Sequence, residues 1–244
     1  IYKGYTIQPY SPMAGTGLSS HELNQPGTYR DVMDTTIVAQ FRADEDSKTK
    51  VLDLCGLSDL GELPVDFLAW TTTPWTLPSN TALTVGSKID YVVVRTKNRY
   101  TDSEGFVILA ENLLEKQFAN GPEHEVVGRC KGSDLVGMRY IQLINWATPM
   151  DRPEEAFRII AGDFVTTEDG TGIVHTAPTF GADDAMVAKQ AVPQVPPMLV
   201  KDANENLVPL VDLQGKFRPE LREFAGKYVK NEYYDDGQAP EKSV

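Results

Sequence analysis

The chain has 244 residues, of which 41% are hydrophobic and 24% are charged, as is ordinary for a soluble globular protein. This length suffices for one large or two small domains with a real hydrophobic core. No stretch approaches 18 continuous apolar residues, and the first residues lack an apolar signal-peptide core, so we expect neither a membrane span nor a signal peptide. The formal net charge of −12 argues against a broad basic surface for nucleic-acid phosphates.

The only two cysteines, Cys55 and Cys130, lie far apart and belong to no Cys-x-x-Cys or His-rich motif. Ordinary thiols in a reducing compartment explain them better than a disulfide or a metal pair. We therefore expect a cytoplasmic chain without a bound metal.

Short apolar runs predict a chain made mostly of strands, with few helices. The charged segment 44–50 predicts a surface loop, and residues 235–244 predict a polar, mobile tail. Many short strands and a few helices favour an α+β fold built on a β-barrel or mixed sheet. In chain order, the predicted strands are 35–41, 65–70, 81–85, 91–96, 105–110, 125–129, 140–144, 158–160, 173–176 and 228–233, and the predicted helices are 111–119, 133–136 and 183–191.

Residues 70–80 form a polar string that follows the predicted strand 65–70 and reads WTTTPWTLPSN. Its two prolines stiffen the backbone around three consecutive threonines. Alternation along an extended chain places Thr71 and Thr73 on one face, toward a pocket, and Thr72 on the other, packed or bonded to backbone. Asn80 can return to the same site across the turn. From residue types alone, a Thr-rich edge strand ending in a turn remains the simpler interpretation.

A second string, residues 170–184, reads GTGIVHTAPTFGADD. His175 ends its short apolar strand, where a histidine is more often structural than functional. His21 and His124 lie in polar segments and are expected at the surface. Asp183 and Asp184 open the predicted helix 183–191, so one can cap the helix while the other faces a ligand.

Together the two strings resemble the editing-domain signature of isoleucyl-tRNA synthetases. The related valyl and leucyl domains usually carry Arg where Thr73 stands and an acidic residue where Trp75 stands, so the string favours the isoleucyl branch. The resemblance covers nearly the whole chain and is weakest in the first 25 residues or so and the last ten. Residues 12–16 resemble a segment with zinc-binding cysteines in many relatives, but this chain has none there, so no structural metal is expected.

The resemblance implies a β-barrel core decorated by a few helices. It also implies a connecting segment at 1–34, an editing domain at 35–234 and a tail at 235–244. The chain lacks the His-Ile-Gly-His and Lys-Met-Ser-Lys-Ser signatures of class I synthetases, so we expect an excised insertion domain that does not aminoacylate. It is expected to need no cofactor, since ATP and Mg²⁺ serve only the full-length synthetase.

The implied reaction is hydrolysis of the ester of mischarged Val-tRNA(Ile) by a positioned water. Asp184 would hold the α-ammonium of valine, Thr71 and Thr73 would place the acyl group and the water, and His175 would orient the ribose or substrate. Asp183 remains the helix-capping candidate. The further substrate-binding candidates are Thr72, Trp75, Asn80 and Asp183.

The implied partners are the 3′ end of tRNA(Ile) carrying valine and the rest of the synthetase chain. The fragment itself is expected to be a monomer away from membranes, with weak affinity for tRNA because it is acidic. Two alternatives remain open: a non-catalytic module that binds the tRNA 3′ end, and an editing domain of the valyl or leucyl branch.

Overall fold

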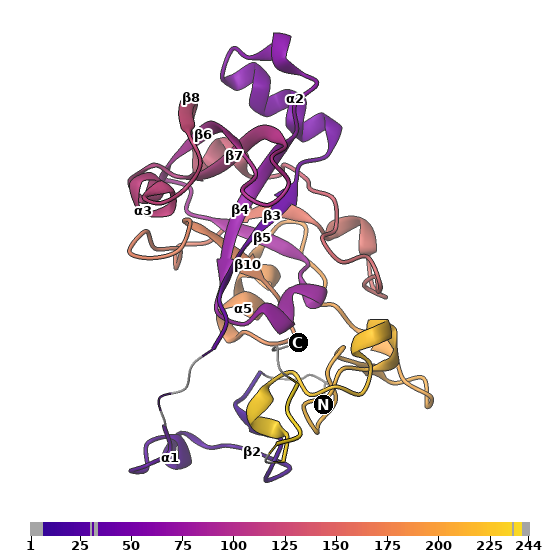
Figure 1. Ribbon diagram of the computed structural model, residues 1–244. Helices are drawn as coiled ribbons and strands as arrows, with labels where there is room; N and C mark the ends of the chain where they lie inside the picture. The colour runs from indigo at the N-terminus through magenta and orange to yellow at the C-terminus, as the bar shows by residue number, and fades with distance from the viewer. Residues whose placement is uncertain (1–6, 30, 32–33, 236, 241–244) are drawn as a thin grey trace.

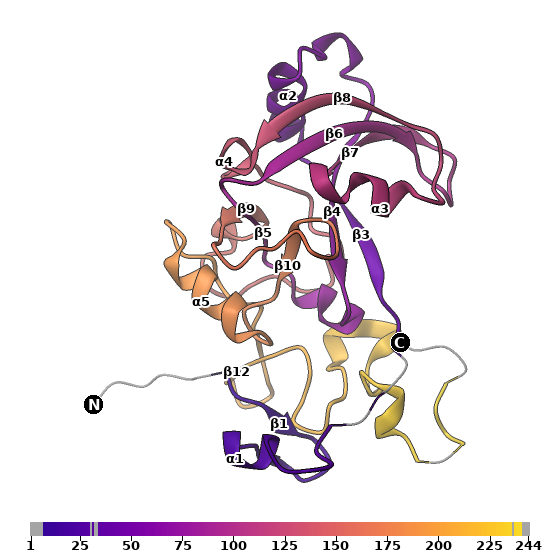
Figure 2. The same cartoon turned by 90° about the vertical axis from the view of Figure 1, so that its left-hand side faces the viewer.

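The computed structural model describes residues 7–29, 31, 34–235 and 237–240. Its centre is an eight-stranded sheet in the order β8-β6-β7-β4-β10-β5-β9, with β3 paired to β4. The sheet curls into a half-barrel, and β6, β7 and β8 arch over its upper part (Figures 1 and 2). This confirms the predicted α+β class. The strands are β3 (Ile37–Arg42), β4 (Val65–Thr71), β5 (Ala82–Val85), β6 (Asp90–Lys97), β7 (Glu104–Ala110), β8 (His124–Lys131), β9 (Arg158–Ala161) and β10 (Ile173–Thr176).

Strand β4 organises the sheet because it pairs with three others. Along one edge, β3 runs antiparallel over its whole length. Along the other, the beginning of β4 pairs parallel with β7, and its end pairs parallel with β10 through Trp70 and Val174. Its apolar sequence suits this position, since strands covered on both faces are hydrophobic throughout. The change of partner along β4 brings β10 to the end of β4 that carries the threonine string.

Helices are short and peripheral. Helix α3 covers the face of β6 and β7 that carries Val92 and Leu109, and α5 packs through Val187 against Ile160 of β9. The opposite face of β6 and β7 belongs to the main core. Within the described part of the chain, no helix has the length and apolar character needed to cross a membrane. The helices are α1 (Ser20–Leu23), α2 (Glu45–Leu54), α3 (Leu114–Phe118), α4 (Gly132–Leu135) and α5 (Ala182–Gln190), with 3₁₀ turns at Ser58–Leu60, Pro74–Ser79, Glu111–Leu113, Pro153–Glu155, Pro219–Phe224 and Asn231–Tyr233.

The prediction of a charged loop at 44–50 is wrong, because α2 begins there. The Asp44 carboxylate caps this helix by accepting a hydrogen bond from the Ser47 amide at 2.8 Å. Glu45 and Asp46 follow in the first turn, where negative charge favours the helix. The capping aspartate was the sequence signal for this helix.

Two predicted strands do not form. In segment 140–144, the amides of Tyr140 and Ile141 bond to different segments, at Phe157 and Arg42, so no ladder develops. In segment 228–233, Tyr228 makes one isolated bridge to Lys216 and a 3₁₀ turn follows. In both segments, apolar residues pack into a core without an extended partner strand.

The last part of the described chain forms a separate small core below the sheet, next to the hairpin of β1 (Tyr10–Ser11) and β2 (Thr16–Gly17) (Figures 1 and 2). It includes the hairpin of β11 (Val200–Lys201) and β12 (Leu207–Val208). The predicted segments 1–34 and 235–244 lie partly outside the described residues, at 1–6, 30, 32–33, 236 and 241–244.

Candidate functional site

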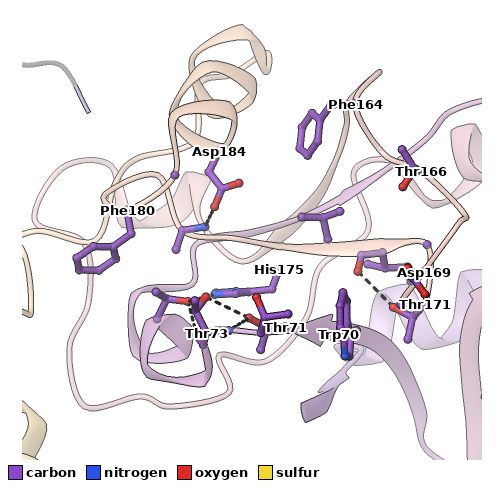
Figure 3. A pocket seen from close by; sticks show the side chains of 18 of the residues that line it. Trp70, Thr71, Thr73, Phe164, Thr166, Asp169, Thr171, His175, Phe180 and Asp184 are labelled. Atoms are coloured by element: carbon purple, nitrogen blue, oxygen red, sulfur yellow. Dashed lines mark hydrogen bonds between the residues drawn. The ribbon is translucent and has the colours of Figure 1, made fainter. Parts of the chain in front are cut away.

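The two polar strings meet because the strands that carry them are parallel neighbours. Trp70 of β4 is the register partner of Val174 of β10, so the residues that follow, Thr71 and His175, lie near the carboxyl ends of these two neighbouring strands. Figure 3 shows both side chains on one side of a cavity, with Asp184 on the other. Two segments about a hundred residues apart thus build one site.

A cavity of about 390 Å³ lies at this junction. Its volume falls within the range of about 300–1,000 Å³ that is usual for small-molecule sites. Besides the two strings, its wall includes the loop between β9 and β10. The lining residues are Trp70, Thr71, Thr72, Thr73, Trp75, Thr76, Phe164, Thr166, Asp169, Gly170, Thr171, Gly172, Ile173, Val174, His175, Ala177, Phe180, Gly181 and Asp184.

The threonine string presents two hydroxyls on one side, as strand alternation predicts. The Thr71 Oγ1 accepts a hydrogen bond from the Thr73 amide at 3.0 Å, and the two hydroxyl oxygens lie 3.4 Å apart. Thr72 is exposed at the rim of the cavity, so the expectation that it is packed is wrong. The chain turns into the 3₁₀ segment at Pro74, which leaves Thr72 on the outside of the bend.

His175 is buried and both of its ring nitrogens have partners inside the protein. Nε2 lies 2.9 Å from the Thr76 hydroxyl, and Nδ1 lies 2.8 Å from the Asn80 side-chain amide. Burial lowers the pKa of the imidazole to about 4, so His175 is neutral at physiological pH. The imidazole therefore forms a fixed part of the cavity wall and links Thr76 to Asn80 by hydrogen bonds. With both nitrogens already bonded, it does not suit the role of general base.

The low pKa of His175 predicts acid destabilisation. An unfolded histidine has a pKa of about 6.5, so below that pH the unfolded chain binds a proton that the folded chain, with its pKa of about 4, does not. The contribution of neutral His175 to the free energy of unfolding is therefore complete above about pH 6.5 and is lost as the pH falls toward 4. We expect His175 to account for a loss of about 2–3 kcal/mol in the free energy of unfolding between pH 7 and 4.5.

Urea unfolding of the wild type and His175→Gln at both pH values measures this contribution. The glutamine variant should lose less stability on acidification by that amount. An equal loss in the two proteins would show that His175 is not the titrating group.

The two aspartates at the start of α5 have different environments. Asp184 lines the cavity, and its Oδ2 accepts a hydrogen bond from the Ala177 amide at 2.8 Å (Figure 3). Burial raises the pKa of the Asp184 carboxyl, the Ala177 amide opposes this, and the nearby charge of Asp183 adds to it. A Cβ at Gly181 would lie 2.8 Å from the Asp184 carboxyl carbon, so only glycine leaves room for this side chain.

Asp183 is exposed and is not the helix cap. Helix α5 begins at Ala182 after Gly181, and no side chain caps its first amides. Asp183 also lies outside the residues that line the cavity. The prediction of a capping role for Asp183 is therefore wrong, because the helix starts one residue earlier than the sequence pattern suggests.

Asn80 and Trp75 occupy different positions. Asn80 is buried behind His175 and does not line the cavity. Trp75 does line it and packs edge-on against Phe180, with ring centroids 5.0 Å apart. Its Nε1 is buried without a hydrogen-bond partner among the described residues. Trp75 thus serves as an apolar wall on the side facing the C-terminal core.

Sequence reasoning missed the wall formed by the β9–β10 loop. Polar side chains of the 111–118 segment hold this loop: Asn112 donates to the Thr167 hydroxyl at 2.7 Å and Gln117 donates to the Gly170 carbonyl at 2.6 Å. Lys116 forms an ion pair with Asp169. Residues 162–169 of this loop lie outside both strings and show no sequence periodicity, so nothing in them signals a wall before the fold is known.

No three His, Cys, Asp or Glu side chains of the described residues are grouped to hold a metal ion, and the absence of a resident metal stays a prediction.

Both cysteines are free thiols. Burial raises the pKa of Cys55, and it raises that of Cys130 to about 12.

Comparison with curated proteins identifies the family. The chain is 53% identical over 251 residues to the isoleucine–tRNA ligase of Cytophaga hutchinsonii, covering 97% of this chain and 21% of that protein. It is 39% identical to the isoleucine–tRNA ligase of Clostridium tetani, covering 97% of this chain and 19% of that protein. The chain is homologous to the isoleucine–tRNA ligases. It spans about a fifth of the length of these relatives. No family model matches it.

Solved structures of editing domains share the fold. The cytosolic leucyl-tRNA synthetase editing domain of P. knowlesi superposes with a TM-score of 0.54 at 17% identity, over 67% of this chain and 65% of that one. The corresponding domain of P. falciparum gives 0.51 at 13% identity, over 64% and 65%. This isoleucine–tRNA ligase homologue therefore has the fold of the leucyl-tRNA synthetase editing domains, as the motif resemblance predicted.

Proposed function

We propose that this chain is the post-transfer editing domain of an isoleucyl-tRNA synthetase and hydrolyses the ester of mischarged Val-tRNA(Ile). The observation that carries the proposal is the cavity between the two strings, with the half-buried Asp184 carboxylate on one side and two threonine hydroxyls and His175 on the other. These groups match the parts of an aminoacylated ribose: an ammonium, an acyl group and hydroxyls.

Asp184 binds the substrate ammonium in this proposal. Its Oδ2 is engaged by the Ala177 amide, which orients the carboxylate and leaves its other oxygen for a cation. Burial raises the pKa of Asp184 and so disfavours its charged form. An ammonium removes that penalty because opposite charges at close range favour each other's ionised forms.

The reaction is attack by a positioned water. The water oxygen bonds to the acyl carbon, the bond to the 3′ oxygen of the ribose breaks, and the water's proton reaches that oxygen through a neighbouring ribose hydroxyl. Thr71 and Thr73 hold the acyl group and the water, and His175 borders the substrate. Most of the rate then comes from positioning, without a covalent intermediate.

Selectivity explains why such a site exists. One methylene in an apolar pocket gives limited discrimination, and the value known for isoleucyl-tRNA synthetases themselves is about 150-fold between isoleucine and valine. A second site that admits valine and sterically refuses isoleucine removes the residual errors. In the intact synthetase, the partners would be the 3′ end of tRNA(Ile) and the rest of the chain.

Deacylation of Val-tRNA(Ile) and Ile-tRNA(Ile) by this chain tests the proposal. We expect Val-tRNA(Ile) to be hydrolysed far faster, and equal rates would contradict a steric sieve. Binding without hydrolysis at high chain concentration would instead indicate a tRNA 3′-end module. Preferential hydrolysis of Thr-tRNA(Val) or Met-tRNA(Leu) would place the chain in the valyl or leucyl branch.

A further inference from the structure

A buried hydrogen-bond chain runs from outside the cavity to its threonines. It begins at Tyr140, which lies 60 residues from Asn80 in sequence and donates from its hydroxyl to the Asn80 Oδ1 at 2.5 Å. The Tyr140 ring packs edge-on against Phe41 and Phe157, and only 3% of the residue is exposed. Tyr140 is outside the set of residues that line the cavity.

The orientation of the Asn80 amide is fixed by its partners. The Ala82 carbonyl lies 2.8 Å from Nδ2 and can only accept, so the amide nitrogen must face it. The second hydrogen of Nδ2 then points to the His175 Nδ1, 2.8 Å away. This nitrogen must accept, and the single proton of the neutral imidazole is on Nε2.

The His175 Nε2–H in turn determines the direction of the remaining bonds. It donates to the Thr76 Oγ1 at 2.9 Å, so the Thr76 hydroxyl proton is free to bond the Thr73 carbonyl at 2.8 Å. The Thr73 hydroxyl lies 3.3 Å from the same Thr76 oxygen. In the opposite tautomer, Nε2 and the Thr73 carbonyl would compete for one Thr76 proton, and the turn that places Thr73 would lose a bond.

We propose that Tyr140 is a positioning residue, whose hydroxyl holds Asn80 so that His175 keeps the Nε2–H tautomer and Thr73 keeps its place in the cavity. The consequence for catalysis rests on the proposed editing function. The tautomer itself does not, so the two parts can be tested separately.

Tyr140→Phe is the informative variant because it keeps the packed ring and removes only the donor. It leaves the Asn80 Oδ1 buried and unpaired, and such a group is costly enough to drive rearrangement. The Ala82 carbonyl alone then holds the amide orientation, so we expect the amide to turn in a fraction of the molecules and His175 to populate both tautomers. Hydrolysis of Val-tRNA(Ile) should fall by about tenfold, equivalent to one lost hydrogen bond.

Nitrogen-15 NMR of the chain with labelled histidines reports the tautomer directly. The exposed His21 and His124 give reference signals in the same spectrum for rings outside the buried hydrogen-bond chain. Tyr91→Phe is the matched control for the tautomer, because Tyr91 is also fully buried and its hydroxyl donates elsewhere, to the Gly172 carbonyl at 2.6 Å. His175 should show a pure Nε2–H pattern in the wild type and in Tyr91→Phe, and a mixed pattern in Tyr140→Phe.

The outcomes separate the two claims. A mixed tautomer together with slower hydrolysis in Tyr140→Phe supports the proposal. An unchanged tautomer, or a mixed tautomer with wild-type hydrolysis, overturns the positioning role. If Tyr140→Phe shows a mixed tautomer but the wild-type protein itself does not hydrolyse Val-tRNA(Ile), the hydrogen-bond network is supported and the editing function is overturned instead.

Discussion

Replacing Asp184 should abolish hydrolysis of Val-tRNA(Ile) without unfolding the protein. Removal of one partner of a desolvated charge pair costs several kcal/mol, so we expect a loss of about 100-fold or more in kcat/KM for Asp184→Ala and Asp184→Asn. Asparagine retains an oxygen for the Ala177 amide, which Asp184 now bonds at 2.8 Å. It therefore removes the charge alone.

The stability of the Asp184→Asn variant provides an independent check. Burial raises the pKa of Asp184, so the folded state binds its proton more tightly than the unfolded chain does. The ionised carboxylate therefore lowers the free energy of unfolding at neutral pH, and its neutral substitute should be as stable as the wild type or more so. The same raised pKa predicts that hydrolysis declines as the pH falls through it, because the protonated acid no longer binds an ammonium.

Asp183→Asn is the matched control. Asp183 neighbours Asp184 in the same turn but is exposed and caps nothing. Its replacement should change stability by no more than about 0.5 kcal/mol and hydrolysis by no more than about twofold, as for ordinary surface positions. If Asp183→Asn lost hydrolysis while Asp184→Asn retained it, the assignment of the ammonium site would be wrong.

The second large effect is a change of specificity in His175→Ala. Isoleucine has every polar group of valine, so only shape can refuse it. His175 is the bulkiest member of the wall among the three candidates Thr71, Thr73 and His175, and β10 fixes its position. Removing the ring opens space for more than one methylene, so the variant should hydrolyse correctly charged Ile-tRNA(Ile). It should keep only part of its activity on Val-tRNA(Ile), because the bond to Thr76 is also lost.

Thr73→Ala is the comparison for this experiment. It removes a smaller volume and a hydroxyl, so it should reduce the rate on Val-tRNA(Ile) more than it relaxes selectivity. Deacylation of both substrates by both variants distinguishes these effects. If His175→Ala is inactive on both substrates, the imidazole serves only to hold Asn80 and Thr76 in place through its hydrogen bonds. The group that excludes isoleucine then lies elsewhere.

The sequence predicted the centre of the fold better than its margins. Strand β4 is mostly apolar and strand β10 begins with Ile173 and Val174, so both were predicted within a residue or so of their bounds. The segments at 140–144 and 228–233 failed because apolar residues can bury themselves without a partner strand. Helix α2 was missed because its charged first turn outweighed the buried Val51 and Leu52 that follow.

The candidate site was likewise predicted only in part. The pocket-facing threonines, His175 and Asp184 could be found because each belongs to one of two local strings. Tyr140 and the β9–β10 loop could not, since their roles depend on contacts across 60 residues or on side chains of another element. Asn80 was correctly assigned to the first string, but its side chain bonds His175 and does not line the cavity. The 3₁₀ turn at Pro74–Ser79 gives the side chain this direction.

A crystal structure of the chain with a non-hydrolysable valyl-adenosine analogue tests the central claim most directly. The account predicts that the analogue occupies the cavity between β4 and β10, with its ammonium on the Asp184 carboxylate, its acyl group beside Thr71 and Thr73, and its γ-carbons against His175. The isoleucyl analogue should bind far more weakly. An analogue bound outside this cavity, an ammonium directed away from Asp184, or equal binding of the two analogues would contradict it.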